Sequence, residues 1–253
     1  MPVNRKLYTS HLTETGSPHY RCPRCTGGHY RLVKESLKFQ RTADTKKIEN
    51  EQWFDSEYDE LRFVAMLTCD NERCGEVAVV AGKGWVDDWH DDDGNHLYQH
   101  LFLPYHVQPS PLLISIPEKC PHEVRLELEY AFLSSWSDFA AAGNHIRSAT
   151  ERILDSLKVL KQIVNRKNKR QRLSLHDRIE RIKESHPDVY ECFMAIKWLG
   201  NAASHSSVLT RDSVFDALDI LESVMERVYS KHPAALKLLV RQVIARRGPM
   251  RKV

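Results

Sequence analysis

The sequence has no apolar run of the roughly 18–20 residues that a helix needs to cross a bilayer. Its first 17 residues also lack the apolar core of a signal peptide, so the cytoplasm is the predicted location. A glycine-rich phosphate loop is missing as well, because GKGW at residues 82–85 does not have the required spacing. We therefore expect neither a membrane protein nor a nucleotide-binding regulator that uses such a loop.

A large excess of charge of one sign is also absent from the whole chain, but its two parts differ. Over 253 residues the formal net charge is +3, and the 42% hydrophobic and 28% charged residues are ordinary for a soluble protein. Residues 1–108 contain 13 Lys/Arg and 17 Asp/Glu, whereas residues 109–253 contain 24 and 17. We expect any polyanion partner at the second part, because basic surfaces concentrate nucleic acid.

Four of the six cysteines form two close pairs, CPRC with Cys22 and Cys25, and CDNERCGE with Cys69 and Cys74. In a reducing cytoplasm, close pairs favour metal binding over disulfides, and Zn²⁺ prefers four such ligands in a tetrahedron. We predict a structural Zn²⁺ site, because four thiolates leave no open coordination position for chemistry. Free or disulfide-bonded cysteines remain the alternative.

The region that holds these pairs, residues 20–107, has a β-rich pattern, with strand-like runs in HYRLVKESLKF, LRFVAMLTC and EVAVVAGKGW. The acidic stretch at residues 87–96 is expected to be a turn-rich loop. Four prolines in QPSPLLISIPEKCP then predict an extended connector.

After Pro121 the apolar residues recur at helical spacing. The pattern predicts successive helices that begin near residues 122, 140, 174, 187, 210 and 233. The second is expected to run to about residue 164 and to be followed by a mobile basic link, NRKNKRQR. Short links between amphipathic helices favour an antiparallel bundle.

The expected fold class is therefore α+β, with a small β-rich, zinc-ribbon-like N-terminal domain followed by an all-α, up-and-down helical bundle. The first domain is predicted to span residues 1–108, and residues 109–120 form the Pro-rich connector. The bundle is predicted to span residues 121–232, and residues 233–253 form a basic C-terminal helix and tail.

Three phrases in the helical part are distinctive: GNHIRSATERILDSL, LSLHDRIERI and IKWLGNAASHSSVLT. Together with ALDILESVMERVY, they resemble domain-of-unknown-function family 4145, which is similar to the HEPN superfamily. The resemblance covers about residues 109–232 and implies an up-and-down bundle that often dimerises, here behind a zinc ribbon. It also implies metal-independent RNA cleavage in active members, and a place in toxin–antitoxin or antiphage systems.

Carried over from the resemblance, His205 matches the motif histidine and Asn201 the polar residue that follows the motif arginine. Gly200 stands where that arginine would be, and Lys197 is the nearest upstream cation. A histidine can move protons near neutral pH, and fixed cations stabilise charge on a reacting phosphate. In a catalytic interpretation, His205 is the acid/base, Lys197 and Arg147 stabilise the phosphate, and Asn201 orients it.

Simpler interpretations of the same residues remain open. Gly200 and Asn201 can mark a helix end, and Arg147 can form an i,i+4 ion pair with Glu151. Two functional hypotheses follow. One is a HEPN-like protein that binds or cleaves RNA in bacterial defence or stress, as a homodimer or with a defence-system protein. The other is a non-catalytic dimerisation and partner-docking module, with the zinc ribbon as its recognition head.

Overall fold

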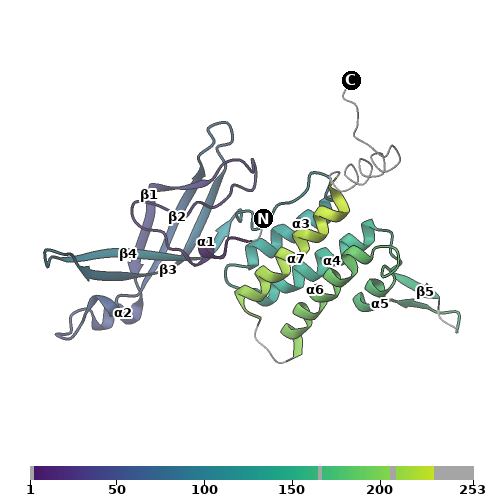
Figure 1. Ribbon diagram of the computed structural model, residues 1–253. Helices are drawn as coiled ribbons and strands as arrows, with labels where there is room; N and C mark the ends of the chain where they lie inside the picture. The colour runs from purple at the N-terminus through teal and green to yellow at the C-terminus, as the bar shows by residue number, and fades with distance from the viewer. Residues whose placement is uncertain (1–2, 165–166, 206–208, 231–253) are drawn as a thin grey trace, which may run out of the picture.

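The computed structural model describes residues 3–164, 167–205 and 209–230, with only the backbone described for residues 200–205 (Figure 1). A four-stranded antiparallel sheet is followed by a helical region, so the predicted α+β class is confirmed at this level. The helix and tail predicted for residues 233–253 lie outside the described residues. None of the described helices is both long and apolar enough to cross a membrane.

The sheet is a meander in which each strand pairs with the next one along the chain. Its strands are β1 Tyr30–Arg41, β2 Leu61–Cys69, β3 Val77–His90 and β4 His96–Gln108. Alternate residues of β2 are buried, beginning with Leu61 and Phe63, while Val64 and Met66 on the other face are about half exposed. Period-two alternation therefore gives the sheet one face in the core and one face in solvent.

The loop expected over residues 87–96 is wrong for half of its length, because residues 87–90 and His96 belong to strands. β3 and β4 continue as a paired ribbon through Asp87–His90, and Trp89 lies opposite Leu97. Only residues 91–95 form the turn, in which Asp91 Oδ1 accepts hydrogen bonds from the backbone N–H groups of Asp93 and Asn95. Both faces of this ribbon are exposed, so its sequence lacks the alternation that identifies a half-buried strand.

The helical region contains five helices in the described part of the chain. They are α3 His122–Ser134, α4 Phe139–Ser156, α5 Leu175–Glu180, α6 Pro187–His205 and α7 Arg211–Tyr229. The helix starts predicted at residues 174 and 210 are confirmed, because Ser174 forms a capping box with Asp177 and Thr210 caps α7. Helices α3, α4, α6 and α7 lie side by side (Figure 1) and share one apolar core.

Two helix predictions near α4 are corrected by the structure. The helix expected over residues 122–139 ends at Ser134, and Asp138 caps the start of α4. α4 itself ends at Ser156 rather than near residue 164, and Lys158 adopts a left-handed conformation with φ of 60°. The chain then forms a short hairpin of β5 Gln162–Val164 and β6 Arg170–Arg172. The mobile link predicted for residues 165–172 is therefore wrong over residues 170–172, which pair as a strand.

A short helix, α1 Arg5–Thr9, joins the sheet to the helical region, as Figure 1 shows. Arg5 forms ion pairs with Asp216 (2.5 Å) and Asp219 (3.1 Å) of α7. The buried ring of Tyr8 packs against Phe215 of α7, with ring centres 5.5 Å apart. The sequence predicts no element here, because five residues are too few to show a helical period.

The Pro-rich connector over residues 109–120 contains no helix or strand, and it contributes to the core. Leu112, Leu113 and Ile114 are buried, although no helix or strand contains them. The backbone N–H of Ser115 donates a 2.6 Å hydrogen bond to the buried carboxylate of Glu222 in α7. The connector therefore packs against the helices instead of spanning a gap.

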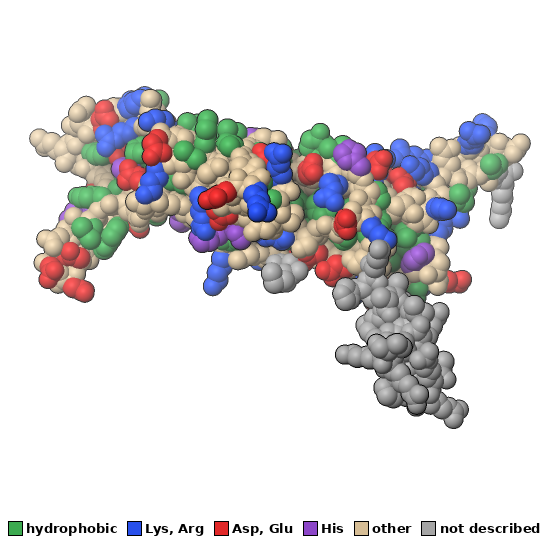
Figure 2. All heavy atoms as spheres, turned by 90° about the horizontal axis from the view of Figure 1, so that it is seen from above, with side chains coloured by type: hydrophobic (Ala, Val, Ile, Leu, Met, Phe, Trp, Pro, Cys, Tyr) green, Lys and Arg blue, Asp and Glu red, His purple; other side chains and the backbone are tan. Residues whose placement is uncertain are grey.

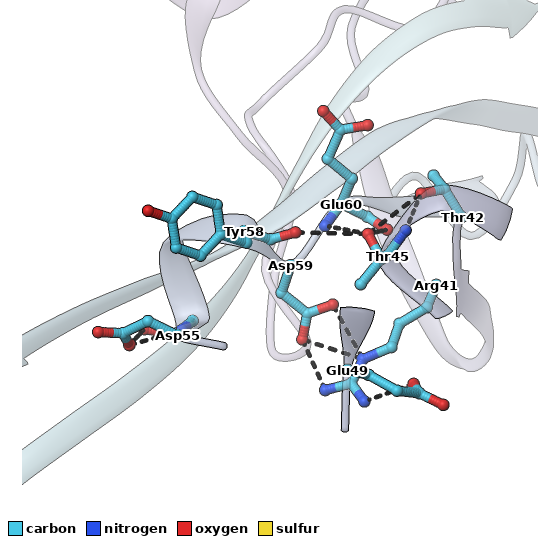
Figure 3. Close-up of polar contacts among 9 residues, drawn as sticks. Arg41, Thr42, Thr45, Glu49, Asp55, Tyr58, Asp59 and Glu60 are labelled. Carbon is cyan, nitrogen blue, oxygen red and sulfur yellow. Dashed lines mark hydrogen bonds and ion pairs between the residues drawn. The ribbon is translucent and has the colours of Figure 1, made fainter. Parts of the chain in front are cut away.

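The segment between β1 and β2 contains α2 Ala43–Ile48 and a 3₁₀ turn, η1 Ser56–Tyr58. Figure 3 shows that Nε and Nη2 of Arg41, at the end of β1, donate hydrogen bonds to the carboxylate of Asp59. The Asp59 side chain is only 7% exposed, and Arg41 also binds Glu49 at 3.0 Å. An ion pair with two parallel hydrogen bonds is stronger than a single contact. It therefore holds the segment between β1 and β2 in place at the end of the sheet.

Arg41→Ala is expected to lower the free energy of unfolding by roughly 1–3 kcal/mol, because Asp59 would stay buried without its partner. Urea unfolding followed by circular dichroism measures the change. The control is Arg62→Ala, since Arg62 is exposed on β2 and is expected to shift stability by about 0.5 kcal/mol or less. Equal stability of wild type and Arg41→Ala would contradict a stabilising role for the Arg41–Asp59 ion pair.

Candidate metal centre

Two turns at one end of the sheet carry the cysteine pairs. Cys22 and Cys25 lie in the turn that precedes β1, Cys69 is the last residue of β2, and Cys74 lies in the turn before β3. Tyr30 pairs with Cys69 in the β1–β2 ladder, and this register sets the first turn against the second. The 43 residues that separate the pairs in sequence are therefore no obstacle, because antiparallel pairing brings their ends together.

The four sulfur atoms lie within 4.8 Å of one another, which is close enough to share one ion. Cys22 Sγ is 3.8 Å from Cys74 Sγ, and Cys25 Sγ is 3.6 Å from Cys69 Sγ. A tetrahedron with Zn–S bonds of about 2.3 Å has S–S edges of about 3.8 Å, whereas a disulfide needs about 2.05 Å. The cysteines are not disulfide-bonded, and their spacing fits a tetrahedral four-thiolate metal site.

Hydrogen bonds within each turn hold the thiols in place. The backbone N–H of Cys22 donates to Gly28 O at 2.9 Å, and that of Cys74 donates to Asn71 O at 2.8 Å. The N–H of Gly28 donates to Cys25 Sγ at 3.3 Å. A Cβ at position 28 would lie only 2.5 Å from Cys69 Sγ, so this turn requires glycine to admit the second pair.

The thiols differ in acidity because their surroundings differ. Burial acts to raise the pKa of Cys25, but hydrogen bonds from Gly28 N–H and from the other thiols outweigh it and lower that pKa to about 6. Burial raises the pKa of Cys69 to about 12 and also raises that of Cys22. A bound divalent cation compensates the negative charge of such packed thiolates, which is why metal and protons compete for them.

The other histidines and cysteines considered as ligands lie outside the group of four. His19 Nε2 lies 2.6 Å from Arg31 Nη1, and its ring is 6.2 Å from that of His29. Neither histidine belongs to the group of four ligands. Cys120 is buried next to the start of α3, and Cys192 is partly buried on α6. The cluster therefore consists of the four cysteines that the sequence predicted to bind metal.

The candidate catalytic residues lie on α4 and α6. Arg147 Nε on α4 is 4.0 Å from Glu151 Oε1, as expected for an i,i+4 ion pair. Lys197 Nζ on α6 lies 3.9 Å from the centre of the Trp198 ring. Asn201 and His205 belong to the last turns of α6 by their backbone, but their side chains lie outside the described residues. The catalytic arrangement of these four residues stays a prediction.

Sequence reasoning missed one cluster of polar side chains entirely. The guanidinium of Arg178 on α5 is buried and donates to Asp155 of α4 at 2.7 Å. The one signal in the sequence is the arginine next to Ile179 in the apolar stripe of a short helix. That signal does not identify a partner, because Asp155 lies 23 residues earlier in the chain.

Cys69→Ser is expected to reduce bound metal well below one ion per chain, because three thiolates hold a tetrahedral ion less tightly than four. Elemental analysis of purified protein measures the metal content. Cys192→Ser is the matched control, since Cys192 lies on α6 outside the cluster, and it should keep the wild-type content. A folded wild-type protein with no metal and freely reactive thiols would rule out the site.

Comparison with known families matches the two parts of the chain separately. Residues 10–107 match a domain of unknown function (DUF8608), and this stretch contains all four cysteines of the cluster. Residues 129–247 match a domain of unknown function (DUF4145). Neither the curated proteins nor the solved structures gave a match. The similarity of the helical part to family 4145, predicted from four short phrases, is therefore confirmed.

Proposed function

We propose that this protein is a HEPN-like RNA-binding protein with an N-terminal zinc ribbon. The spacing of the four sulfur atoms supports Zn²⁺ in the cysteine cluster. Four thiolates complete the coordination of the ion, so its role is to hold the two turns together. The match to DUF4145 supports the assignment of the helical part, through the resemblance of that family to the HEPN superfamily.

The observation that carries RNA binding is the basic β5–β6 hairpin. Residues 161–172 contain six Lys/Arg and no Asp/Glu. The described cations of this segment are all exposed, and Figure 2 shows Lys and Arg side chains gathered where the hairpin projects at the right of the view. Phosphate contacts supply most of the affinity in sequence-independent nucleic-acid binding, so a projecting ribbon of cations suits an RNA backbone.

RNA cleavage is the catalytic form of this proposal and depends on α6. His205 would move the protons, while Lys197 and Arg147 would stabilise the negative charge that builds up on the phosphate. Asn201 would orient the phosphate. α4 and α6 pack against each other in one core, which is compatible with a site formed by residues of both helices.

Binding without cleavage is the second candidate, and one residue favours it. Gly200 occupies the position at which the resemblance places an arginine, so a fixed cation is missing from the motif. In this form the helical part would serve as a dimerisation or docking platform for RNA and a defence-system protein. The zinc ribbon would then be the recognition head.

RNA affinity is expected to fall steeply with salt, because cations that bind phosphates displace counterions. Fluorescence anisotropy of a labelled single-stranded RNA at several salt concentrations gives the slope of log K against log salt. Lys169→Gln with Arg170→Gln should reduce that slope by roughly 0.7 for each lost phosphate contact. Lys46→Gln, an exposed cation on α2, is the control. Salt-independent binding, or an equal loss with Lys46→Gln, would overturn the hairpin assignment.

His205→Ala separates the two candidates. If the chain cleaves RNA, this variant should be roughly 100-fold or more slower without divalent metal, because a general acid/base contributes at least that much. Gel analysis of a labelled RNA incubated in buffer without added divalent metal measures the rate. Equal rates in both proteins, or no cleavage in either, would remove the catalytic form and leave binding alone.

A further inference from the structure

A cavity of about 310 Å³ lies where α1, the connector and the segment before β1 meet. Its apolar lining comes from Leu7 and Tyr8 of α1 and from Leu112 and Leu113 of the connector. Tyr8 and the two connector leucines are buried, and Leu7 is partly buried. A concave, largely apolar surface with a few polar groups is the usual form of a small-molecule site.

The basic side chains of the lining lie on one face of a short antiparallel pairing. Arg21 forms an isolated bridge with His29, and residues paired in this way point to the same side. His19 is two residues before Arg21 and therefore points to that side as well. The rings of His19 and His29 are 6.2 Å apart. All three side chains line the cavity, whereas no Asp or Glu of the described residues does.

Arg21 carries the fixed charge of this group, and it has no carboxylate partner in the described part of the chain. Its guanidinium makes one long hydrogen bond, from Nη1 to Ser115 Oγ at 3.5 Å. Arg24, three residues further on, is paired with Glu76 instead. Because Arg21 is partly buried, solvent ions screen its charge less than that of an exposed side chain. An unpaired cation in the wall of a cavity suits an anionic ligand.

The other polar groups of the lining supply hydrogen-bond donors and add no negative charge. His19 Nε2 lies 2.6 Å from Nη1 of Arg31, which can only donate, so Nε2 accepts and the ring proton is on Nδ1. Burial raises the pKa of Tyr8 well above its ordinary value, so its hydroxyl stays neutral. Asn4 also lines the cavity, and its side chain does not cap α1. These groups add donors to those of the guanidinium.

We propose that this cavity binds a small apolar carboxylic acid. Its carboxylate would accept two parallel hydrogen bonds from Arg21, and its hydrocarbon part would pack on Leu7, Leu112 and Leu113. One fixed cation matches the single charge of a carboxylate, whereas a phosphate dianion would keep an unbalanced charge in an apolar site. The volume is at the lower end of the range for small-ligand sites, which suits a short acid. This site goes beyond RNA binding, because no residue of the β5–β6 hairpin lines it.

Isothermal titration of the full-length chain with hexanoate, hexan-1-ol and inorganic phosphate tests the site. Hexanoate should bind saturably, and hexan-1-ol should bind roughly 10-fold or more weakly, because it lacks the charged hydrogen bonds. Pentanoate and butanoate should each bind about fourfold more weakly than the next longer acid, since each buried CH₂ contributes about that factor. These comparisons use the wild-type protein and need no variant.

Arg21→Gln should weaken hexanoate binding roughly 10-fold or more, because it removes both charged hydrogen bonds. Arg24→Gln is the matched control and should bind as wild type does, since Arg24 also lies next to a cysteine of the cluster but outside the cavity. Lys169→Gln with Arg170→Gln, the hairpin variant, should also keep hexanoate binding. Circular dichroism checks that each variant is folded.

Two kinds of result decide the question. Hexanoate binding that falls in Arg21→Gln and persists in Arg24→Gln supports the proposal, whether or not the chain binds RNA. Undetectable binding of hexanoate to wild type, equal binding of hexanoate and hexan-1-ol, or equal binding by wild type and Arg21→Gln would overturn it. Binding of phosphate in place of hexanoate would overturn it as well, because that result indicates a purely ionic site.

Discussion

The contact on which both halves of this protein depend is the packing of Tyr8 among three other aromatic rings. Its ring centre lies 5.0 Å from that of Trp136, 5.5 Å from that of Phe215 and 5.8 Å from that of Tyr20. Trp136 and Phe215 belong to the helical region, whereas Tyr20 belongs to the sheet side. Aromatic rings bury large areas and favour tilted arrangements, so one side chain from a five-residue helix joins two layers into one core.

The cysteine cluster is built directly on this core. Tyr20 is two residues before Cys22, and Tyr30, whose N–H donates to Tyr20 O at 2.8 Å, pairs with Cys69 in the ladder. Both tyrosines are fully buried. The turns that carry the thiols thus rest on buried aromatic packing, which helps to hold the four sulfur atoms close together.

Charge is divided between the ends of the molecule in a way that the net value conceals. The N-terminal part is acidic overall, and the ribbon of β3 and β4 ends in the turn that contains Asp91. The opposite end carries the basic β5–β6 hairpin, as Figures 1 and 2 show. At the base of that hairpin the buried Arg178 of α5 donates a 2.7 Å hydrogen bond to the partly exposed carboxylate of Asp155 on α4.

The sequence by itself determined the features that depend on short spacings. Paired cysteines predicted the cluster, and strand-like runs predicted β1, β2 and the start of β3. Capping residues such as Ser174 and Thr210 marked helix starts. The tertiary structure decided what depends on distant partners: the joining helix α1 and the β5–β6 hairpin. The physical reason is that pairing energies between residues far apart in the chain leave no local period. Arg178 has the same neighbours in sequence whether or not Asp155 lies beside it. Only the packing of α5 on α4 brings these two side chains into contact.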